Sequence, residues 1–260
     1  MKFSPAAQFE PDSRLVGDVH VSPNTGERRG GLAPTILIMH YTGMASAAQA
    51  IDWLSRPQSK VSCHYVIDEA GRITQMVPER LRAWHAGVAH WAGENDINSA
   101  SIGIEIQNPG HEDGYQLFSR AQMRAVRDLS IDIIGRRGIA PERVLAHSDV
   151  APLRKIDPGE RFDWRWLARA GVGHWVPAVP RRAGDKAAPD DSMLAAMSSM
   201  LAEYGYGVGV DGASGPDVAP VVGAFQRHFR PSCVDGRVDR STLATLERLL
   251  DALAKGAVLH

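Results

Sequence analysis

The sequence has few of the features that assign a chain to a specialised class. Only two of its 260 residues are cysteines, Cys63 and Cys233, which excludes a disulfide framework and a cysteine-based zinc site. No run of about 18 apolar residues occurs, so we expect no membrane span. The formal net charge of −1 lacks the basic excess of a nucleic-acid-binding protein. The ten histidines are the one compositional surplus, and they predict that any bound metal is held by imidazole and carboxylate groups.

The first residues also lack the signals of export. They contain no continuous apolar stretch, no Ala-x-Ala cleavage site and no lipid-attachment cysteine. This absence predicts a cytoplasmic location, with the periplasm or cell envelope as the alternative.

Residues 179–191 (VPRRAGDKAAPDD) divide the chain. They mix Pro, Gly, Ala and both charge signs without a hydrophobic period, which predicts an exposed linker. Residues 1–178 alternate strand-like and helix-like runs, so we expect an α/β domain with a mixed central sheet flanked by helices. Residues 192–260 carry three amphipathic helical stripes and predict a small three-helix domain.

Several elements of the larger domain are recognisable. Ser119 and Gln122 have the spacing of a capping box, which predicts a helix that begins after Ser119. Ile102, Ile104 and Ile106 alternate with polar or small residues, as expected for a strand with one apolar face. Further strands are predicted at residues 35–39, 64–67, 72–77 and 143–146, and a helix at residues 46–54.

Four polar residues lie on or next to these apolar runs. His40 and His147 directly follow predicted strands, Glu105 lies on the alternating strand, and Asp157 follows in a loop stiffened by prolines. Strand ends of an α/β sheet meet at one edge, where such proteins place their sites. Two imidazoles and one carboxylate can hold a catalytic zinc and leave a position for water.

The chemistry that follows is hydrolysis of an amide or ester. Zinc lowers the pKa of water and polarises a carbonyl. Glu105 could then take the proton of the water and pass it to the leaving amine, while Lys155 could stabilise the oxyanion. The residue pattern leaves other interpretations open. A strand-end histidine such as His40 is often structural, Asp157 before Pro158 can begin a turn, and Glu105 can lie on a solvated face.

Four motifs, which follow one another along the sequence, favour the metal-site interpretation over these alternatives. The strings HYTGM from His40, AWHAG from Ala83, NSASIGIEI from Asn98 and HSDVAPLRKIDPG from His147 resemble the zinc-dependent N-acetylmuramoyl-L-alanine amidases of type 2, which are related to peptidoglycan recognition proteins. The resemblance covers roughly residues 20–170 and includes SPNTGER at Ser22 to Arg28.

The resemblance implies a substrate and a set of site residues. The substrate is peptidoglycan or its anhydro-muropeptide fragments, and the bond cut joins the lactyl group of N-acetylmuramic acid to L-alanine. The implied zinc ligands are His40, His147 and Asp157. Glu105 matches the acid that assists the water, and Lys155 matches the group that steadies the oxyanion. The implied substrate-groove residues are Trp84, His85 and Asn98.

The C-terminal segment carries a second resemblance. Its AFQRHF and VDGRVDRSTLATL strings are similar to the type 1 peptidoglycan-binding domain, which implies a wall-targeting module. We expect a monomer that binds no nucleic acid. Two functions are alternatives to the amidase: a non-catalytic muropeptide sensor and a zinc endopeptidase acting on peptide crosslinks. The presence of all three implied ligands together with Glu105 favours the amidase.

Overall fold

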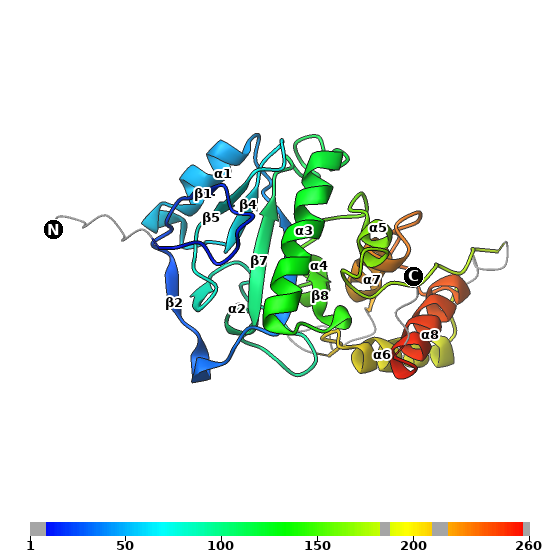
Figure 1. Ribbon diagram of the computed structural model, residues 1–260. Coiled ribbons are helices and arrows are strands. Elements are labelled where there is room, and N and C mark those ends of the chain that lie inside the picture. Colours follow the sequence, from blue (N-terminus) through cyan, green and yellow to red (C-terminus); the bar gives the residue numbers. More distant parts are fainter. Residues whose placement is uncertain (1–8, 183–187, 210–217, 257–260) are drawn as a thin grey trace.

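The computed structural model describes residues 9–182, 188–209 and 218–256 (Figure 1). The strands are β1 (Asp18–Val19), β2 (Thr25–Glu27), β3 (Ile36–Tyr41), β4 (Tyr65–Ile67), β5 (Ile73–Gln75), β6 (Leu81–Ala83), β7 (Ser101–Ile106) and β8 (Val144–Ala146). The helices are α1 (Ala47–Leu54), α2 (Ile97–Ala100), α3 (Arg120–Arg137), α4 (His147–Val150), α5 (Trp164–Ala168), α6 (Asp191–Tyr204), α7 (Ala219–Phe229) and α8 (Arg240–Ala254). Short 3-10 turns lie at Arg29–Gly31, Pro57–Ser59 and Pro141–Arg143.

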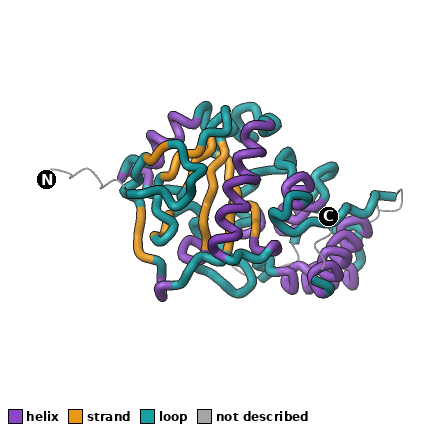
Figure 2. Tube along the Cα trace, viewed as in Figure 1, coloured by secondary structure: helices purple, strands orange, loops and turns teal. Residues whose placement is uncertain are grey.

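A mixed sheet forms the centre of the larger domain. Within the described residues it has six strands in the order β1-β5-β4-β7-β3-β8, and β2 pairs with β6 in a separate antiparallel ribbon. Only the β4–β5 pair of the six-stranded sheet is antiparallel. Figure 2 shows the strands grouped between helices on both sides. The predicted mixed α/β architecture is confirmed.

One strand is longer than its sequence pattern predicts. The apolar run ends at Met39, but β3 continues to Tyr41 because β7 pairs with it along its whole length. His40 therefore lies inside the strand, directly opposite Glu105 of β7, and does not follow the strand. Successive strand residues point to opposite faces, so His40 continues the row formed by Ile36 and Ile38.

The other face of β3 and β7 is entirely apolar. Leu37, Met39 and the three isoleucines of β7 pack there in one cluster with residues of α3 and α5. The helix α3 crosses this face along β7 (Figure 1). Its N-terminus has the predicted capping box, in which the Ser119 hydroxyl accepts from the Gln122 amide and the Gln122 side chain accepts from the Ser119 amide.

A buried carboxylate fixes the other end of α3. Glu79, which has no solvent exposure, accepts hydrogen bonds from Arg136 and Arg137 of α3 and from the Tyr65 hydroxyl. Burial by itself raises the pKa of Glu79, but the hydrogen bonds from Arg136 and Tyr65 outweigh it and bring the pKa down to about 2. The loop before β6 is thereby joined to α3.

Two groups of apolar residues cover different parts of the sheet face that carries His40. Val66 and Met76 pack with Ala47 and Leu54 of α1 at one side. Ile36, Ile38 and Leu145 belong to a second large cluster that also contains apolar residues of α6, α7 and α8. The part of this face that carries His40 and Glu105 lies between these two groups of apolar residues.

The three C-terminal helices thus share a hydrophobic core with the sheet. Figure 1 shows them grouped beside β8 and α4. Val179, the first residue of the predicted linker, donates its amide to the Thr245 hydroxyl and accepts at its carbonyl from Ser241 of α8. Residues 183–187 of that linker lie outside the described part of the chain.

No helix in the described residues is long and apolar enough to cross a membrane. The cytoplasmic location stays a prediction, and residues 1–8, on which it partly depends, lie outside the described residues.

Candidate active site

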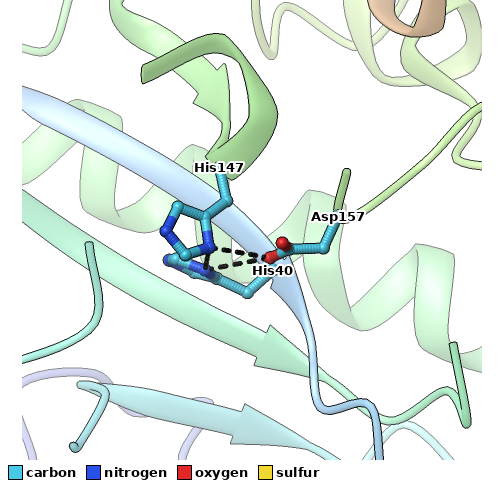
Figure 3. A group of neighbouring side chains, drawn as sticks. All are labelled: His40, His147 and Asp157. Carbon is cyan, nitrogen blue, oxygen red and sulfur yellow. Dashed lines mark hydrogen bonds and ion pairs between the residues drawn. The ribbon is translucent and has the colours of Figure 1, made fainter. Parts of the chain in front are cut away.

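Three of the predicted residues meet in one buried group. His40 from β3, His147 from the start of α4 and Asp157 from the following loop point toward one another (Figure 3). The two Nδ1 atoms lie 2.9 Å apart, and Asp157 Oδ2 lies 3.2 Å from His40 Nδ1 and 3.0 Å from His147 Nδ1. All three residues are buried. The group is built across parallel strands because β3 and β8 are hydrogen-bonded neighbours.

A chain of hydrogen bonds fixes the ring of His40. Its Nε2 lies 2.9 Å from Nδ1 of His85, whose own Nε2 lies 3.2 Å from the Ser101 hydroxyl. The Ser101 hydroxyl donates to the carbonyl of Ile97. A carbonyl oxygen can only accept, so the Ser101 hydroxyl accepts from His85 Nε2, and His85 Nδ1 accepts from His40 Nε2. His40 therefore carries its proton on Nε2, and its Nδ1, which faces His147 and Asp157 in the triad of proposed ligands, is unprotonated.

Gly103 makes room for this arrangement. A Cβ at that position would lie 2.6 Å from the ring of His85. The glycine of the IGIE string therefore allows His85 to lie directly against β7, where it reaches His40.

His147 is oriented in the same way. Its Nε2 lies 3.2 Å from the carbonyl of Ala86, which also accepts a hydrogen bond from Arg154 at 3.0 Å. A carbonyl has no proton to give, so His147 carries its proton on Nε2 and presents a bare Nδ1 to the triad. Histidines that bind metals typically donate the proton of their other ring nitrogen to a carbonyl or carboxylate in this way.

Burial favours the neutral form of the imidazoles of His40 and His85. Burial, together with the proximity of His147, lowers the pKa of His40 to about 4. Burial also lowers the pKa of His85 well below its ordinary value. A histidine binds a metal in its neutral form, so the lowered pKa suits His40 to be a ligand.

Glu105 projects from β7 beside the triad. It lines a cavity of about 450 Å³ together with His147, Asp157 and Lys155. Its Oε2 atom is buried and has no hydrogen-bond partner among the described residues. Burial, and then the negative charge of Asp157, raise the pKa of Glu105 well above its ordinary value. A carboxylate in this state is suited to exchange protons with a reacting group.

The remaining predicted site residues fall in two places. Trp84, His85 and Lys155 line the cavity, and the indole Nε1 of Trp84 has no partner among the described residues. Asn98 is buried behind it, where its Oδ1 accepts the amides of His85 and Ala86 and so shapes the loop that carries them. Direct binding of substrate by Asn98 stays a prediction.

The residue pattern alone did not single out Ser101 or Arg154 as supports of the triad. Ser101 begins β7 and looks like any strand-end serine in the sequence. Arg154 lies between the two ligands of the HSDVAPLRKIDPG string, and that position is the only signal it carries.

Taken together, the donor set fits a divalent metal. Two unprotonated ring nitrogens and a carboxylate oxygen converge beside a cavity. The Nε2 atoms of the two histidines are held by His85 and by the carbonyl of Ala86. The carboxylate of Glu105, with one buried oxygen that has no partner among the described residues, lies next to the group. This arrangement is typical of metal-dependent hydrolases.

The comparisons with known proteins name the family. Residues 30–160 match the N-acetylmuramoyl-L-alanine amidase family, and residues 191–246 match a peptidoglycan binding domain family. The N-acetylmuramoyl-L-alanine amidase AmiD of Escherichia coli is 38% identical over 238 residues, which cover 83% of this chain and 82% of that protein. The chain belongs to the N-acetylmuramoyl-L-alanine amidase family. It is an amidohydrolase, as the sequence motifs predicted.

Solved structures agree in fold. Escherichia coli AmiD in complex with the substrate anhydro-N-acetylmuramic acid-L-Ala-D-gamma-Glu-L-Lys has a TM-score of 0.73 at 36% identity and covers 85% of this chain and 90% of that chain. AMPDH3 from Pseudomonas aeruginosa has a TM-score of 0.73 at 31% identity and covers 86% of this chain and 94% of that chain. Both likenesses cover more of the chain than residues 30–160, which match the amidase family.

Proposed function

We propose that this chain is a zinc-dependent amidase that cleaves the bond between the lactyl group of N-acetylmuramic acid and L-alanine in anhydro-muropeptides. The observation that carries the zinc site is the convergence of His40, His147 and Asp157 with both imidazoles held in the tautomer that a metal needs. The anhydro form is proposed because it is the substrate named for the related AmiD complex.

The proposed metal supplies one part of the chemistry. Zinc held by the three residues lowers the pKa of a water molecule and polarises the scissile carbonyl. The chain supplies the rest. Glu105 accepts the proton of the attacking water and then donates it to the nitrogen of L-alanine as the amide bond breaks.

Lys155 is assigned the role of stabilising the negative charge that develops on the scissile carbonyl oxygen. It lines the same cavity as Glu105 and the triad, and its ammonium can donate to the carbonyl oxygen as that oxygen becomes an oxyanion. His85 holds the ring of His40 in place and does not contact the reacting atoms in this proposal. Trp84 provides an apolar surface on the cavity wall against which the substrate can lie.

The domain boundaries are also a proposal. We assign residues 1–178 to catalysis and residues 192–260 to peptidoglycan binding, joined by residues 179–191. The match of residues 191–246 to a peptidoglycan binding domain supports the second assignment.

Product analysis tests the function. Purified protein is loaded with zinc and incubated with muropeptides, and the products are identified by mass spectrometry. We expect free stem peptides and intact sugar. Cleaved crosslinks with intact lactyl amides would identify an endopeptidase, and the absence of products would identify a binding protein.

Metal removal tests the zinc site separately. Dialysis against a chelator is expected to remove activity, and added zinc is expected to restore it, with about one zinc per chain by elemental analysis. Full activity in a verified zinc-free preparation would contradict the proposed metal site.

A further inference from the structure

A second buried carboxylate lies two residues after the proposed ligand His147. Asp149 has no solvent exposure and is not part of the triad. Its Oδ2 accepts the amide of Ala146, the residue directly before His147, at 2.8 Å. The carboxylate thus closes the turn that presents His147. The helix α4 has only four residues, too few to be stable by intrinsic propensity, so its shape depends on contacts of this kind.

The other two donors to Asp149 come from the C-terminal segment. The Tyr206 hydroxyl donates to Oδ1 at 2.8 Å, and His228 Nδ1 of α7 lies 2.7 Å from Oδ2. Both donor residues are buried. These bonds join parts of the chain that are 57 and 79 residues apart.

Ring contacts hold both donors in place. The His228 ring is stacked between Trp164 and Phe229, with centroid distances of 3.9 Å and 4.0 Å. The Tyr206 ring packs edge-on against Trp91 at 4.9 Å. Because neither donor is free to follow a displaced carboxylate, the position of Asp149 is determined by the C-terminal segment.

We propose that Tyr206 and His228 are positioning residues of the metal centre, which act through Asp149 on the backbone that carries His147. A buried carboxylate that loses a donor is left with an unsatisfied oxygen, at a cost of about 1–3 kcal/mol. The turn relieves that cost by shifting, and the shift moves His147 relative to His40. The C-terminal segment is then part of the catalytic apparatus and not only a means of binding the wall. This inference rests on the proposed ligand role of His147.

The chain offers a matched control for a purely structural role. Tyr204 lies in the same interface, is buried, and packs against Trp91 at 5.8 Å. Its hydroxyl pairs with His174 Nδ1 at 3.1 Å and makes no hydrogen bond to Asp149. Tyr204→Phe and Tyr206→Phe therefore remove the same atom from the same interface, but only the second removes a donor to Asp149.

The test compares the two variants in the full chain. Zinc affinity is measured by competition with a chromophoric chelator, together with kcat, KM and Tm. We expect Tyr206→Phe to weaken zinc binding by about tenfold and to lower kcat with little change in KM. Tyr204→Phe is expected to lower Tm by a similar amount while zinc affinity and kcat stay at the wild-type values.

A second pair of variants guards against misfolding. Asn places an amide N–H near the position of the histidine Nδ1–H, so His228→Asn is expected to retain more zinc affinity than His228→Ala. Equal zinc affinity in wild type and Tyr206→Phe, with an unchanged kcat, would overturn the inference. Wild-type protein that binds no zinc or cleaves no amide would instead contradict the proposed function.

Discussion

At the scale of the residue, Glu105 and His85 show how position determines role. Both lie close to His40, but His85 has a partner at each of its ring nitrogens whereas the buried Oε2 atom of Glu105 has none among the described residues. A residue whose hydrogen bonds are complete supports its neighbours. A buried carboxylate oxygen without a partner is costly for stability, and this cost supports the catalytic role proposed for Glu105.

Removal of this carboxylate should separate catalysis from metal binding. Glu105→Ala is expected to lower kcat by a factor of about 10²–10⁴ because no other group replaces it as proton carrier. Zinc content should equal that of the wild type, since Glu105 is not one of the three ligands. The turnover rate and, by elemental analysis, the zinc content are measured for Glu105→Ala and for the wild type. An active variant with a full complement of zinc would contradict the role assigned to Glu105.

The sequence predicted these residues better than it predicted their supports. His40, Glu105, His147 and Asp157 could be identified because strand patterns and ordered motifs place them at one edge. Tyr206 and His228 could not, because their partner Asp149 is 57 and 79 residues away and no local pattern reports which distant segments pack together.

At the scale of the element, α3 is fixed by one predicted contact and one that sequence reasoning missed. The capping box of Ser119 and Gln122 is local, so its spacing is visible in the sequence. The anchor at the other end joins Glu79 to Arg136 and Arg137 across more than 50 residues. The same distinction explains β3, whose last two residues are held in the strand by pairing with β7 and not by their own propensity.

The Glu79 anchor predicts a pH-dependent contribution to stability. Its folded pKa of about 2 lies below the ordinary value of 4.5, so the contribution is fully present above pH 4.5 and is lost as pH falls toward 2. The shift corresponds to about 3 kcal/mol at neutral pH. Urea unfolding should therefore show Glu79→Gln to be less stable by about that amount.

The difference between wild type and Glu79→Gln should narrow as the pH is lowered from 6 toward 3. Glu247→Gln, which removes an exposed carboxylate of α8, serves as the control and should show no such trend. A gap between wild type and Glu79→Gln that stays constant over this range would show that the anchor does not depend on its charge.

At the scale of the whole molecule, the C-terminal helices cover part of the catalytic sheet. The composition of residues 179–191 predicted an exposed linker between two domains, and the structure adds that Ile36, Ile38 and Leu145 share a core with α6, α7 and α8. Composition reports how polar a segment is, but it does not report whether the modules on either side are packed together.

A shortened chain tests this packing. A protein that ends at Arg182 would expose the apolar residues of β3 and β8 that α7 and α8 now help to bury. We expect it to aggregate or to unfold far more readily than the full chain, which should unfold in a single cooperative transition. Calorimetry and size-exclusion chromatography make the comparison. A monomeric, folded and active fragment would contradict this expectation.

The place of β3 in the sheet has a consequence for the apoprotein. The strand lies between β7 and β8, and its two faces belong to two different hydrophobic clusters. His40 is therefore carried by a segment that cannot rearrange without opening both clusters. In zinc fingers the ion organises the chain, and its removal unfolds the protein. Here the proposed ligand His40 is held in place by the sheet, so removal of the proposed zinc ion should abolish activity and leave the fold intact, and added zinc should restore activity.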